Sequence, residues 1–348
     1  MARRPYRVEV NYPKQGKPQY YLVRDVGVRG LRRKVRKYLG TKPLTREQVE
    51  HCRREHAAEM ELRTALKKGE LSAGALRSEH LDGEQHLQVE QVRYLFQSVG
   101  ELMGETEAAV YEREFEASYV QGTTAIEGNT LTLGETSDLL RYGIAPEGHS
   151  LREVNEVQNF RKVASYRNKY RGRASLDFIR ALHRLVMDNI DFDSAGNFRR
   201  LDTIGIVSAD IRLTPAPVIE AELQEAIEEY YARLDAGFNP FEQAVLFHYR
   251  FEMVHPFTDG NGRVGREILN WMLRCHRYPR LLFLGRERGS YLAALRKGNV
   301  GDFAGLLMQF AKLLVGQRLE RLRENLEQLA SVAPQKRGQL SLSDFIDF

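Results

Sequence analysis

The chain contains few cysteines and no long apolar segment. Only two of its 348 residues are cysteine, Cys52 and Cys275, and these match neither a disulfide framework nor the spacing of metal ligands. No apolar run approaches the roughly 18 residues that a membrane-spanning helix requires, and the basic N-terminus lacks the apolar stretch of a signal peptide. These absences predict a protein of the reducing cytoplasm that is not attached to a membrane.

The common phosphate-binding signatures are missing as well. The sequence has no lysine-containing Walker loop and no kinase-type V-A-I-K segment. One stretch, GNGRVG at residues 260–265, does fit the G-x-G-x-x-G pattern of dinucleotide-binding turns. Such a turn follows a buried parallel strand, however, and strands of that kind are nearly continuous apolar runs.

The segment before these glycines, residues 239–254, is more typical of a helix. Its last eight residues alternate in polarity, so periodicity alone leaves a half-buried strand open, but its length and its other apolar positions favour a helix. Asn239 followed by Pro240 is a typical helix start, and Pro256 marks the stop. A helical apolar stripe follows at residues 264–275. The glycines therefore lie between two helices, which argues against a dehydrogenase.

Positive charge is concentrated at the N-terminus. Residues 1–46 contain fourteen Lys and Arg against two acids, Glu9 and Asp25, which gives a net charge of +12. Because the whole chain carries +5, residues 47–348 carry −7. A basic patch of this kind attracts nucleic acid or an acidic protein surface. A solvated, charged edge without a partner is an equally simple interpretation.

The periodicity predicts a mainly α-helical protein with a small β module at its N-terminus. Residues 6–12, 20–28 and 34–40 have strand character, and we expect them to form a three-stranded antiparallel sheet. Thr45–Gln48 has the pattern of a capping box that opens a helix. Alternation returns only near residues 201–214, and residues 333–348 have the character of a tail or a docking peptide.

The glycine loop brings together groups that suit a polyphosphate. Gly260 and Gly262 allow positive φ, so that backbone N–H groups can converge at a helix N-terminus. Arg263 and Arg266 lie on one face of the following helix, and guanidinium groups fit phosphate oxygens. Asp259 offers a hard oxygen ligand for Mg²⁺. The sequence thus predicts a site for a magnesium-bound polyphosphate.

His255 opens the stretch HPFTDGNGRVGR, residues 255–266, and is a candidate general base because an unperturbed histidine is largely neutral at pH 7. The stretch resembles the signature of the Fic family, His-Pro-Phe-x-(Asp/Glu)-Gly-Asn-(Gly/Lys)-Arg-x-x-Arg, at every defining position. Residues 196–217 resemble the family's β-hairpin flap with its lead-in, and residues 290–303 resemble the segment that lines the adenine end. The resemblance covers roughly residues 110–315 and implies a Fic-type helical bundle core with a β-hairpin flap.

The resemblance also implies a reaction, the transfer of AMP from ATP, with Mg²⁺, to a Ser, Thr or Tyr hydroxyl of a target protein. His255 would be the catalytic base, Phe257 would anchor the loop, and Asp259 would hold Mg²⁺. The residues implied in ATP binding are Gly260, Asn261, Gly262, Arg263, Arg266, Tyr291 and Asn299. The flap residues that would dock the target by strand addition are Thr203, Ile204, Gly205, Ile206 and Val207. Two other histidines, His183 and His248, are interpreted as core residues.

A second motif concerns control of the reaction. The stretch from Thr123 through Glu127 to Gly128 resembles the family's inhibitory motif, (Ser/Thr)-x-x-x-Glu-(Gly/Asn), of the class whose inhibitory helix precedes the catalytic motif. The resemblance implies that Glu127 pairs with Arg266 in the place of the γ-phosphate. A turn with a solvated Glu127 is the alternative. In some relatives such a glutamate aligns the water that removes AMP from a modified target, so de-AMPylation also stays open.

These observations divide the chain into four parts. They are a basic β-rich module (1–44), a helical linker region (45–109), a Fic domain (110–315), and a C-terminal helix and tail (316–348). The expected partners are ATP and a target protein, and a homodimer is one arrangement that could control Glu127. A function of another class stays open too, namely a non-catalytic module that binds nucleic acid or protein through the basic N-terminal residues.

Overall fold

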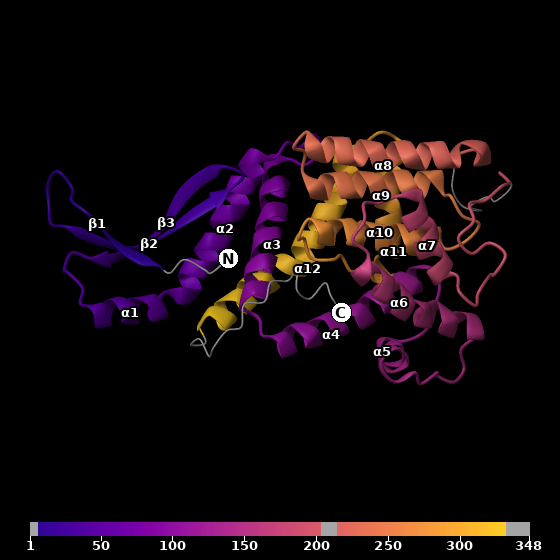
Figure 1. The fold of residues 1–348 in the computed structure, drawn as a ribbon, viewed down its shortest axis with the longest axis horizontal. Coiled ribbons are helices and arrows are strands. Elements are labelled where there is room, and N and C mark those ends of the chain that lie inside the picture. Colours follow the sequence, from indigo (N-terminus) through magenta and orange to yellow (C-terminus); the bar gives the residue numbers. More distant parts are fainter. Residues whose placement is uncertain (1–5, 203–213, 332–348) are drawn as a thin grey trace.

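A computed structural model describes residues 6–202 and 214–331. The N-terminal module is the expected antiparallel sheet, in which β1 (Arg7–Asn11), β2 (Gln19–Val28) and β3 (Leu31–Gly40) pair in the order β1-β2-β3. One face of this sheet packs on α2 (Ala57–Ala75) through a small core of its own, which includes Leu22, Val26 and Met60. Figure 1 shows that the module projects from one end of the molecule, away from the main helical body.

The helices α1 (Arg46–Glu55), α2 and α3 (Gly83–Leu102) connect the β module to the body. The helix α1 begins at the predicted capping box of Thr45 and Gln48, and α3 packs against α2. The long helix α12 (Phe303–Ser331) returns from the body along α3 and α2. The sequence-based boundaries 109/110 and 315/316 fall inside α4 (Glu105–Ile126) and α12, so both helices belong to two of the predicted parts.

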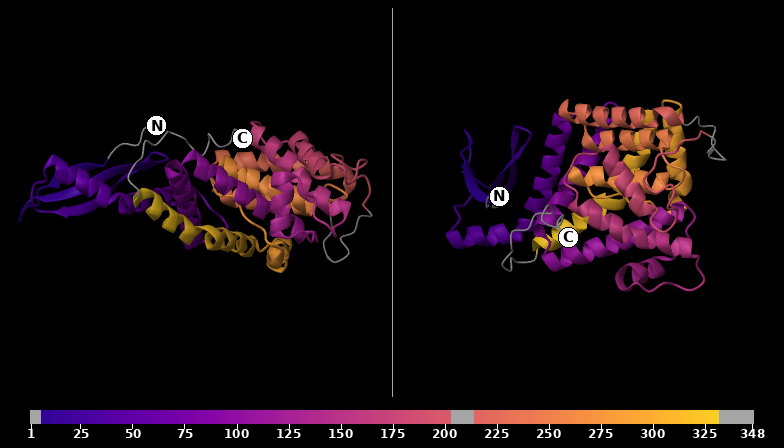
Figure 2. Two further views of the ribbon diagram at one scale, coloured as in Figure 1. Left: turned by 90° about the horizontal axis from the view of Figure 1, so that it is seen from below. Right: turned by 45° about the vertical axis from the view of Figure 1, so that its right-hand side comes forward.

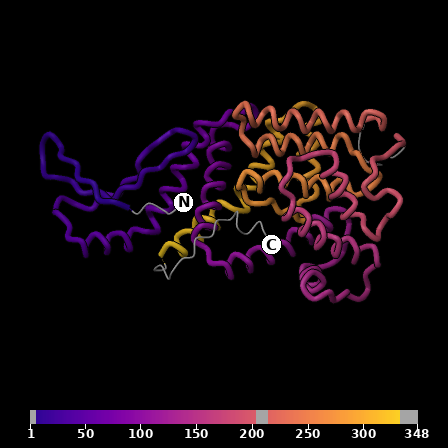
Figure 3. Tube along the Cα trace, in the orientation of Figure 1, coloured from indigo at the N-terminus to yellow at the C-terminus, as the bar shows by residue number. Residues whose placement is uncertain are grey.

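The body is a helical bundle with one continuous apolar core. Figure 2 shows its helices from two further directions, and Figure 3 shows the path of the chain through them. None of the helices within the described ranges is long and apolar enough to cross a membrane. The remaining elements of the body are α5 (Leu133–Tyr142), α6 (Leu151–Lys169), α7 (Leu176–Val186), η1 (Ala216–Val218), α8 (Ile219–Asp235), α9 (Pro240–Val254), α10 (Asn261–Cys275), η2 (Gly285–Glu287) and α11 (Arg288–Asn299).

The glycine loop joins α9 to α10, which pack against each other in the body. Asn239 caps α9 by accepting the N–H groups of Phe241 (2.9 Å) and Glu242 (3.1 Å), with Pro240 in the first turn as predicted. A helix therefore precedes the glycines, and the strand that a dinucleotide-binding turn would need is excluded at this position. The helix α7 packs on α10 and α8 packs on α9, so the loop between α9 and α10 rests on a rigid support.

Candidate active site

The loop between α9 and α10 is held in one conformation by its own residues. His255 ends α9 with a positive φ of 46°, and Gly260 begins α10 with a φ of 77°. The Asn261 side chain closes the loop, because its Oδ1 accepts the Phe257 N–H (2.9 Å) and its Nδ2 donates to the Phe257 carbonyl (2.8 Å). Left-handed backbone is uncommon for histidine and often occurs at functional sites. The amide of Asn261 is thus committed to the loop, which leaves its backbone N–H group for an anion.

His183 on α7 packs against the loop and supports it. Its ring is stacked on Phe257 with the centroids 3.6 Å apart, and its Nδ1 accepts the Gly196 N–H at 2.8 Å. The proton must then lie on Nε2, which donates to the Asp259 carbonyl at 3.0 Å. Burial lowers the pKa of His183 to about 4, so the ring stays neutral in this role. His183 is fully buried and His248 nearly so, in agreement with their interpretation as core residues.

Arg199, a residue that the sequence analysis left without a role, holds the end of α9. Its guanidinium donates to the carbonyls of His255 (2.8 Å), Val254 (3.3 Å) and Thr214, and its own N–H donates to the Pro256 carbonyl (2.8 Å). Carbonyls at a helix end have no partner within the helix, so a buried arginine satisfies them well. The only signal in the sequence was the position of Arg199 in the lead-in to the flap.

The His255 imidazole is half-buried, and its Nδ1 lies out of contact with solvent and without a partner among the described residues. Burial, followed by the positive charge of Arg199, lowers the pKa of His255 below its ordinary value of 6.5. The ring is therefore neutral at pH 7 and able to accept a proton, which is the state that a general base requires.

Arg266 contacts the segment that resembles the inhibitory motif. Its Nε donates to the Thr123 hydroxyl (2.8 Å), and one terminal nitrogen donates both to the Thr123 carbonyl (2.9 Å) and to Glu127 Oε1 (2.7 Å). Arg266 is 1% exposed and the Glu127 side chain is 37% exposed. Burial opposes ionisation of Glu127, but the charge of Arg266 outweighs it and holds the pKa of Glu127 below the usual range.

The Glu127 carboxylate also occupies the space beside the glycine loop. A Cβ atom built at Gly262 would lie 2.3 Å from Glu127 Oε1, so the absence of a side chain at residue 262 lets the carboxylate approach the first turn of α10. Gly128 follows Glu127, the C-cap of α4, with a φ of 103°. The structure thus brings together Thr123, Glu127, Gly128, Gly262 and Arg266, which the sequence places in two motifs more than a hundred residues apart.

Two residues of α6, which the sequence analysis did not single out, face the other end of the loop. Arg152 forms an ion pair with Asp259, and Glu156 Oε1 lies 3.1 Å from the guanidinium of Arg263, which also donates to Asp259 (3.3 Å). Burial opposes ionisation of Asp259, but Arg263 and Arg152 together hold the pKa of Asp259 below its ordinary value. No local pattern links α6 to the loop, so these contacts follow only from the tertiary fold.

The Asp259 carboxylate could hold a metal ion only together with further ligands. Within the described ranges no three His, Cys, Asp or Glu side chains are grouped as a metal site. Mg²⁺, however, is commonly held by one or two carboxylates together with substrate phosphates rather than by a cage of protein ligands. Asp259 lies in this loop and its side chain is 42% exposed, which fits an ion that arrives bound to the substrate phosphates.

A cavity of about 230 Å³ lies beside the inhibitory contact, between the end of α4, α11 and α12. Ile126, Phe283, Tyr291 and Phe310 give it an apolar wall. Tyr291 is fixed by a 2.9 Å hydrogen bond to His248 Nε2, and Arg266 lies 5.7 Å from the centre of its ring. Asn299 does not line this cavity; it lies at the C-terminal end of α11, where its Oδ1 accepts the Tyr249 hydroxyl at 3.3 Å.

Glu252 is a further group that the sequence did not single out. Its Oε1 is buried without a hydrogen-bond partner among the described residues, and a Cβ atom at Gly265 would lie 2.3 Å from it. Burial raises the pKa of Glu252 to about 7, and the negative charge of Glu127 acts in the same direction, against the charge of Arg266. The site therefore holds two carboxylates around one arginine, of which only Glu127 is hydrogen-bonded to it. The predicted docking residues, Thr203 to Val207, lie outside the described ranges.

Comparison with known proteins agrees with this arrangement. Residues 173–273 match the Fic/DOC family. The sequence is 34% identical over 205 residues (58% of this chain) to the protein adenylyltransferase fic-1 of Caenorhabditis elegans. It is 31% identical over 204 residues (57% of this chain) to the protein adenylyltransferase Fic of Drosophila ananassae. The chain spans 40% of the length of each of these relatives.

Solved structures extend the likeness beyond the motif. A fragment of Fic-1 from Caenorhabditis elegans superimposes with a TM-score of 0.59 at 26% identity, over 80% of this chain and 85% of that one. A Fic-domain signalling protein from Bacteroides thetaiotaomicron shares the fold, with a TM-score of 0.61 at 22% identity, over 70% of this chain and 97% of that one. The helix-loop-helix and its supporting helices thus define a Fic-type domain. Residues 173–273 thus match the Fic/DOC family, and the surrounding helices share the fold of solved Fic proteins.

Proposed function

We propose that the protein transfers AMP from ATP to a hydroxyl group of a target protein. The observation that carries this proposal is that His255, Asp259, Gly262, Arg263 and Arg266 converge around one loop that the fold holds rigid. The matched relatives are named protein adenylyltransferases, which supports the same reaction.

The chemistry assigns one task to each group. His255 takes the proton of the target hydroxyl. The hydroxyl oxygen then forms a bond to the α-phosphorus of ATP while the bond to pyrophosphate breaks. This step depends on the placement of the reacting groups and on neutralisation of the phosphate charge. The N-terminus of α10 and the two arginines stabilise the phosphate charge. Asp259, after release from Arg152, would hold Mg²⁺, which would supply further positive charge to the phosphates. Tyr291 and the apolar cavity would receive the adenine ring, and Asn299 would contact the nucleoside only if α11 shifts.

A direct test is incubation with labelled ATP, Mg²⁺ and cell extract. The wild-type protein should label itself or a target, and the reaction should release pyrophosphate. His255→Ala should bind ATP nearly as well but lose at least about a hundredfold in transfer, because a placed base contributes roughly 10²–10⁴-fold. Undiminished transfer by His255→Ala would exclude the general-base role. Mass spectrometry of the labelled extract would identify the target.

We also propose that Glu127 keeps the enzyme inactive until it is displaced. Its carboxylate takes one hydrogen bond of Arg266 and places negative charge beside Gly262, where a triphosphate would lie. A second candidate reaction, removal of AMP from a modified target, is supported by the 37% exposure of the Glu127 side chain, which leaves it accessible to water. Release of AMP from a labelled target by the wild type, but not by Glu127→Gln, would identify that activity.

The basic residues of the β module and an apolar surface patch suggest where partners bind. We propose that residues 1–44 form a targeting module for nucleic acid or an acidic protein, followed by the helical linker, the Fic domain and the C-terminal helix and tail as divided above. Tyr142, Ile144 and Leu151, between α5 and α6, are 60–76% exposed and support a homodimer through this side. Deletion of residues 1–44 should then reduce target labelling but not labelling of the enzyme itself, and Leu151→Asp should shift the protein to the monomer in light scattering.

A further inference from the structure

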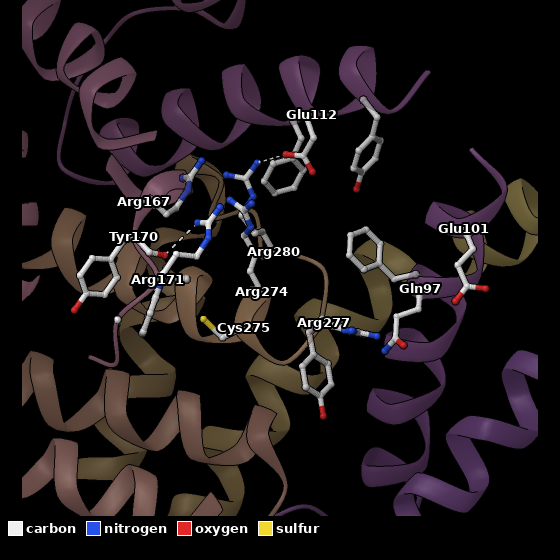
Figure 4. Close-up of a pocket in the computed structure, with 16 residues that line it drawn as sticks. Gln97, Glu101, Glu112, Arg167, Tyr170, Arg171, Arg274, Cys275, Arg277 and Arg280 are labelled. Atoms are coloured by element: carbon white, nitrogen blue, oxygen red, sulfur yellow. Dashed lines mark hydrogen bonds and ion pairs between the residues drawn. The ribbon is translucent and has the colours of Figure 1, made fainter. Parts of the chain in front are cut away.

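A second cavity lies at the opposite end of α10 from the glycine loop. Because α10 rises 1.5 Å per residue, the fourteen steps from Asn261 to Cys275 separate the two places by about 20 Å. The cavity has a volume of about 410 Å³ and opens between α3, α4, the end of α6 and the end of α10. Figure 4 shows its lining. The active-site residues described above are not part of it.

The lining is rich in arginine. Five arginines face the cavity, namely Arg167, Arg171, Arg274, Arg277 and Arg280. Arg167 forms ion pairs with Glu116 (3.0 Å) and Glu267 (2.9 Å), and Arg280 forms ion pairs with Glu116 (2.6 Å) and Glu112 (2.9 Å). Arg171 donates to backbone carbonyls at the end of α6 and has other partners. These three side chains are accounted for by the fold.

Arg274 and Arg277 are different, because no carboxylate lies within ion-pair distance of either among the described residues. The guanidinium of Arg274 donates to Asn168 Oδ1 at 2.7 Å, a neutral partner. Burial, followed by the charges of Arg167 and Arg280, lowers the pKa of Arg274 to about 10. Arg277 follows the end of α10 with a positive φ of 63° and extends toward Gln97 on α3. A buried guanidinium beside other positive charges is stabilised when an anion binds next to it.

The rest of the wall is aromatic. Six aromatic side chains line the cavity: Phe96, Tyr111, Phe115, Tyr170, Trp271 and Tyr278. Arginines already stack on this wall, since Arg280 lies 4.3 Å from the centre of the Phe115 ring. A bare phosphate would fill only part of a 410 Å³ space and would leave the aromatic surface unused, whereas ligand sites of roughly 300–1,000 Å³ commonly combine apolar walls with a few charged groups.

We propose that this cavity is a second ligand site, which binds a nucleoside monophosphate or a similar aryl phosphate with its phosphate on Arg274 and Arg277 and its ring against the aromatic wall. Guanidinium groups bind phosphate oxygens with paired hydrogen bonds, and aromatic faces stack on bases. This site goes beyond the proposed transfer of AMP, because the cavity and the proposed active site have no residues in common. Binding to the cavity can be measured without any transfer reaction.

Cys275 provides a local probe, because it lines the cavity and Cys52 is the only other cysteine in the chain. In a Cys52→Ser protein, the rate at which N-ethylmaleimide modifies Cys275 reports on the cavity alone. AMP at about ten times its Kd should slow this modification roughly tenfold, in proportion to the fraction of empty sites. Ribose and inorganic phosphate, tested separately, should protect far less than AMP at equal concentration.

Two substitutions separate this site from the catalytic one. Arg274→Gln and Arg277→Gln should each weaken protection by AMP at least about tenfold, or roughly 1.4 kcal/mol. Arg266→Gln, which disrupts the proposed ATP site, should leave protection intact. Arg277 serves as the second variant in case loss of the Arg274 contact to Asn168 perturbs folding, which circular dichroism would reveal.

Three outcomes would overturn the proposal. The first is no protection by AMP up to about 10 mM. The second is protection by AMP that is as strong in both the Arg274→Gln and the Arg277→Gln proteins as in the parent protein. The third is protection by inorganic phosphate equal to that by AMP, which would indicate a general anion site without a nucleoside pocket. Loss of protection in Arg266→Gln would show that AMP acts through the catalytic site instead. Because these measurements use no transfer assay, their failure is distinct from failure of the proposed reaction.

Discussion

The carboxylate of Glu127 lies 2.7 Å from a guanidinium nitrogen of Arg266, and the same nitrogen lies 2.9 Å from the carbonyl of Thr123. One arginine thus binds both Thr123 and Glu127 of the predicted inhibitory motif, which lie one helical turn apart at the C-terminal end of α4. A carboxylate in this position competes with a phosphate for the same donor.

Glu127→Gly should therefore activate transfer. Removing the carboxylate frees one Arg266 donor and the space beside Gly262, and a misalignment of about an ångström can cost roughly a hundredfold in rate. We expect labelling of the enzyme and of targets to rise at least about tenfold, which corresponds to about 1.4 kcal/mol of barrier. Glu114→Gly, an exposed position on the same helix, is a matched control for the loss of a glutamate from α4. Equal activity of Glu127→Gly and wild type would refute the inhibitory role.

The pH dependence of transfer should reflect His255. Because burial and Arg199 lower the pKa of His255, the ring loses its proton below pH 6.5, and the neutral form is the active one. The rate in the Glu127→Gly background should rise with pH and reach its plateau with a midpoint below 6.5. Arg199→Gln removes a positive charge, so the midpoint should move upward. A midpoint above 6.5 in the parent protein would contradict the neutral-base assignment.

Arg199 should also matter for stability. Its removal leaves the carbonyls of Val254, His255 and Thr214 without their donor, and an unsatisfied buried polar group costs about 1–3 kcal/mol. Arg199→Ala should therefore lower the free energy of unfolding by about 2–3 kcal/mol in urea titrations. Arg200→Ala, at the next and exposed position, should change it by less than about 0.5 kcal/mol. Similar effects of the two substitutions would mean that the contacts of Arg199 contribute little.

Glu252 predicts a stability effect that depends on pH. Its pKa is raised from 4.5 to about 7, so the folded protein binds this proton more tightly than the unfolded chain does. The resulting stabilisation is complete below about pH 4.5 and is lost as the pH rises toward 7. At pH 8 the buried carboxylate must ionise, at a cost on the order of 1–3 kcal/mol. Glu252→Gln should raise the unfolding free energy at pH 8 and change it little at pH 5; the reverse order would contradict the raised pKa.

Sequence alone could predict the motif and its surroundings along the chain, but not the contacts between distant elements. The three strands, the capping box at Thr45 and the helices around Pro256 follow from local periodicity and helix-end chemistry. Arg152, Glu156, Arg199 and Glu252 are ordinary polar residues in their own segments. They become part of the site only because α6, α9 and the lead-in to the flap pack around α10.

The lock formed by Asn261 and Phe257 has a consequence for how quickly the protein can be switched. Asn261, His183 and Arg199 hold the loop in place while Glu127 is still bound to Arg266. No segment of this loop has to become ordered when the inhibitory contact opens, so activation costs little conformational entropy there. The transition between the proposed inhibited and active states then reduces to the displacement of the Glu127 side chain, and side-chain movements are far faster than loop folding. Under the proposed inhibition, a partner that binds the end of α4 would control the rate of transfer in a graded and reversible way.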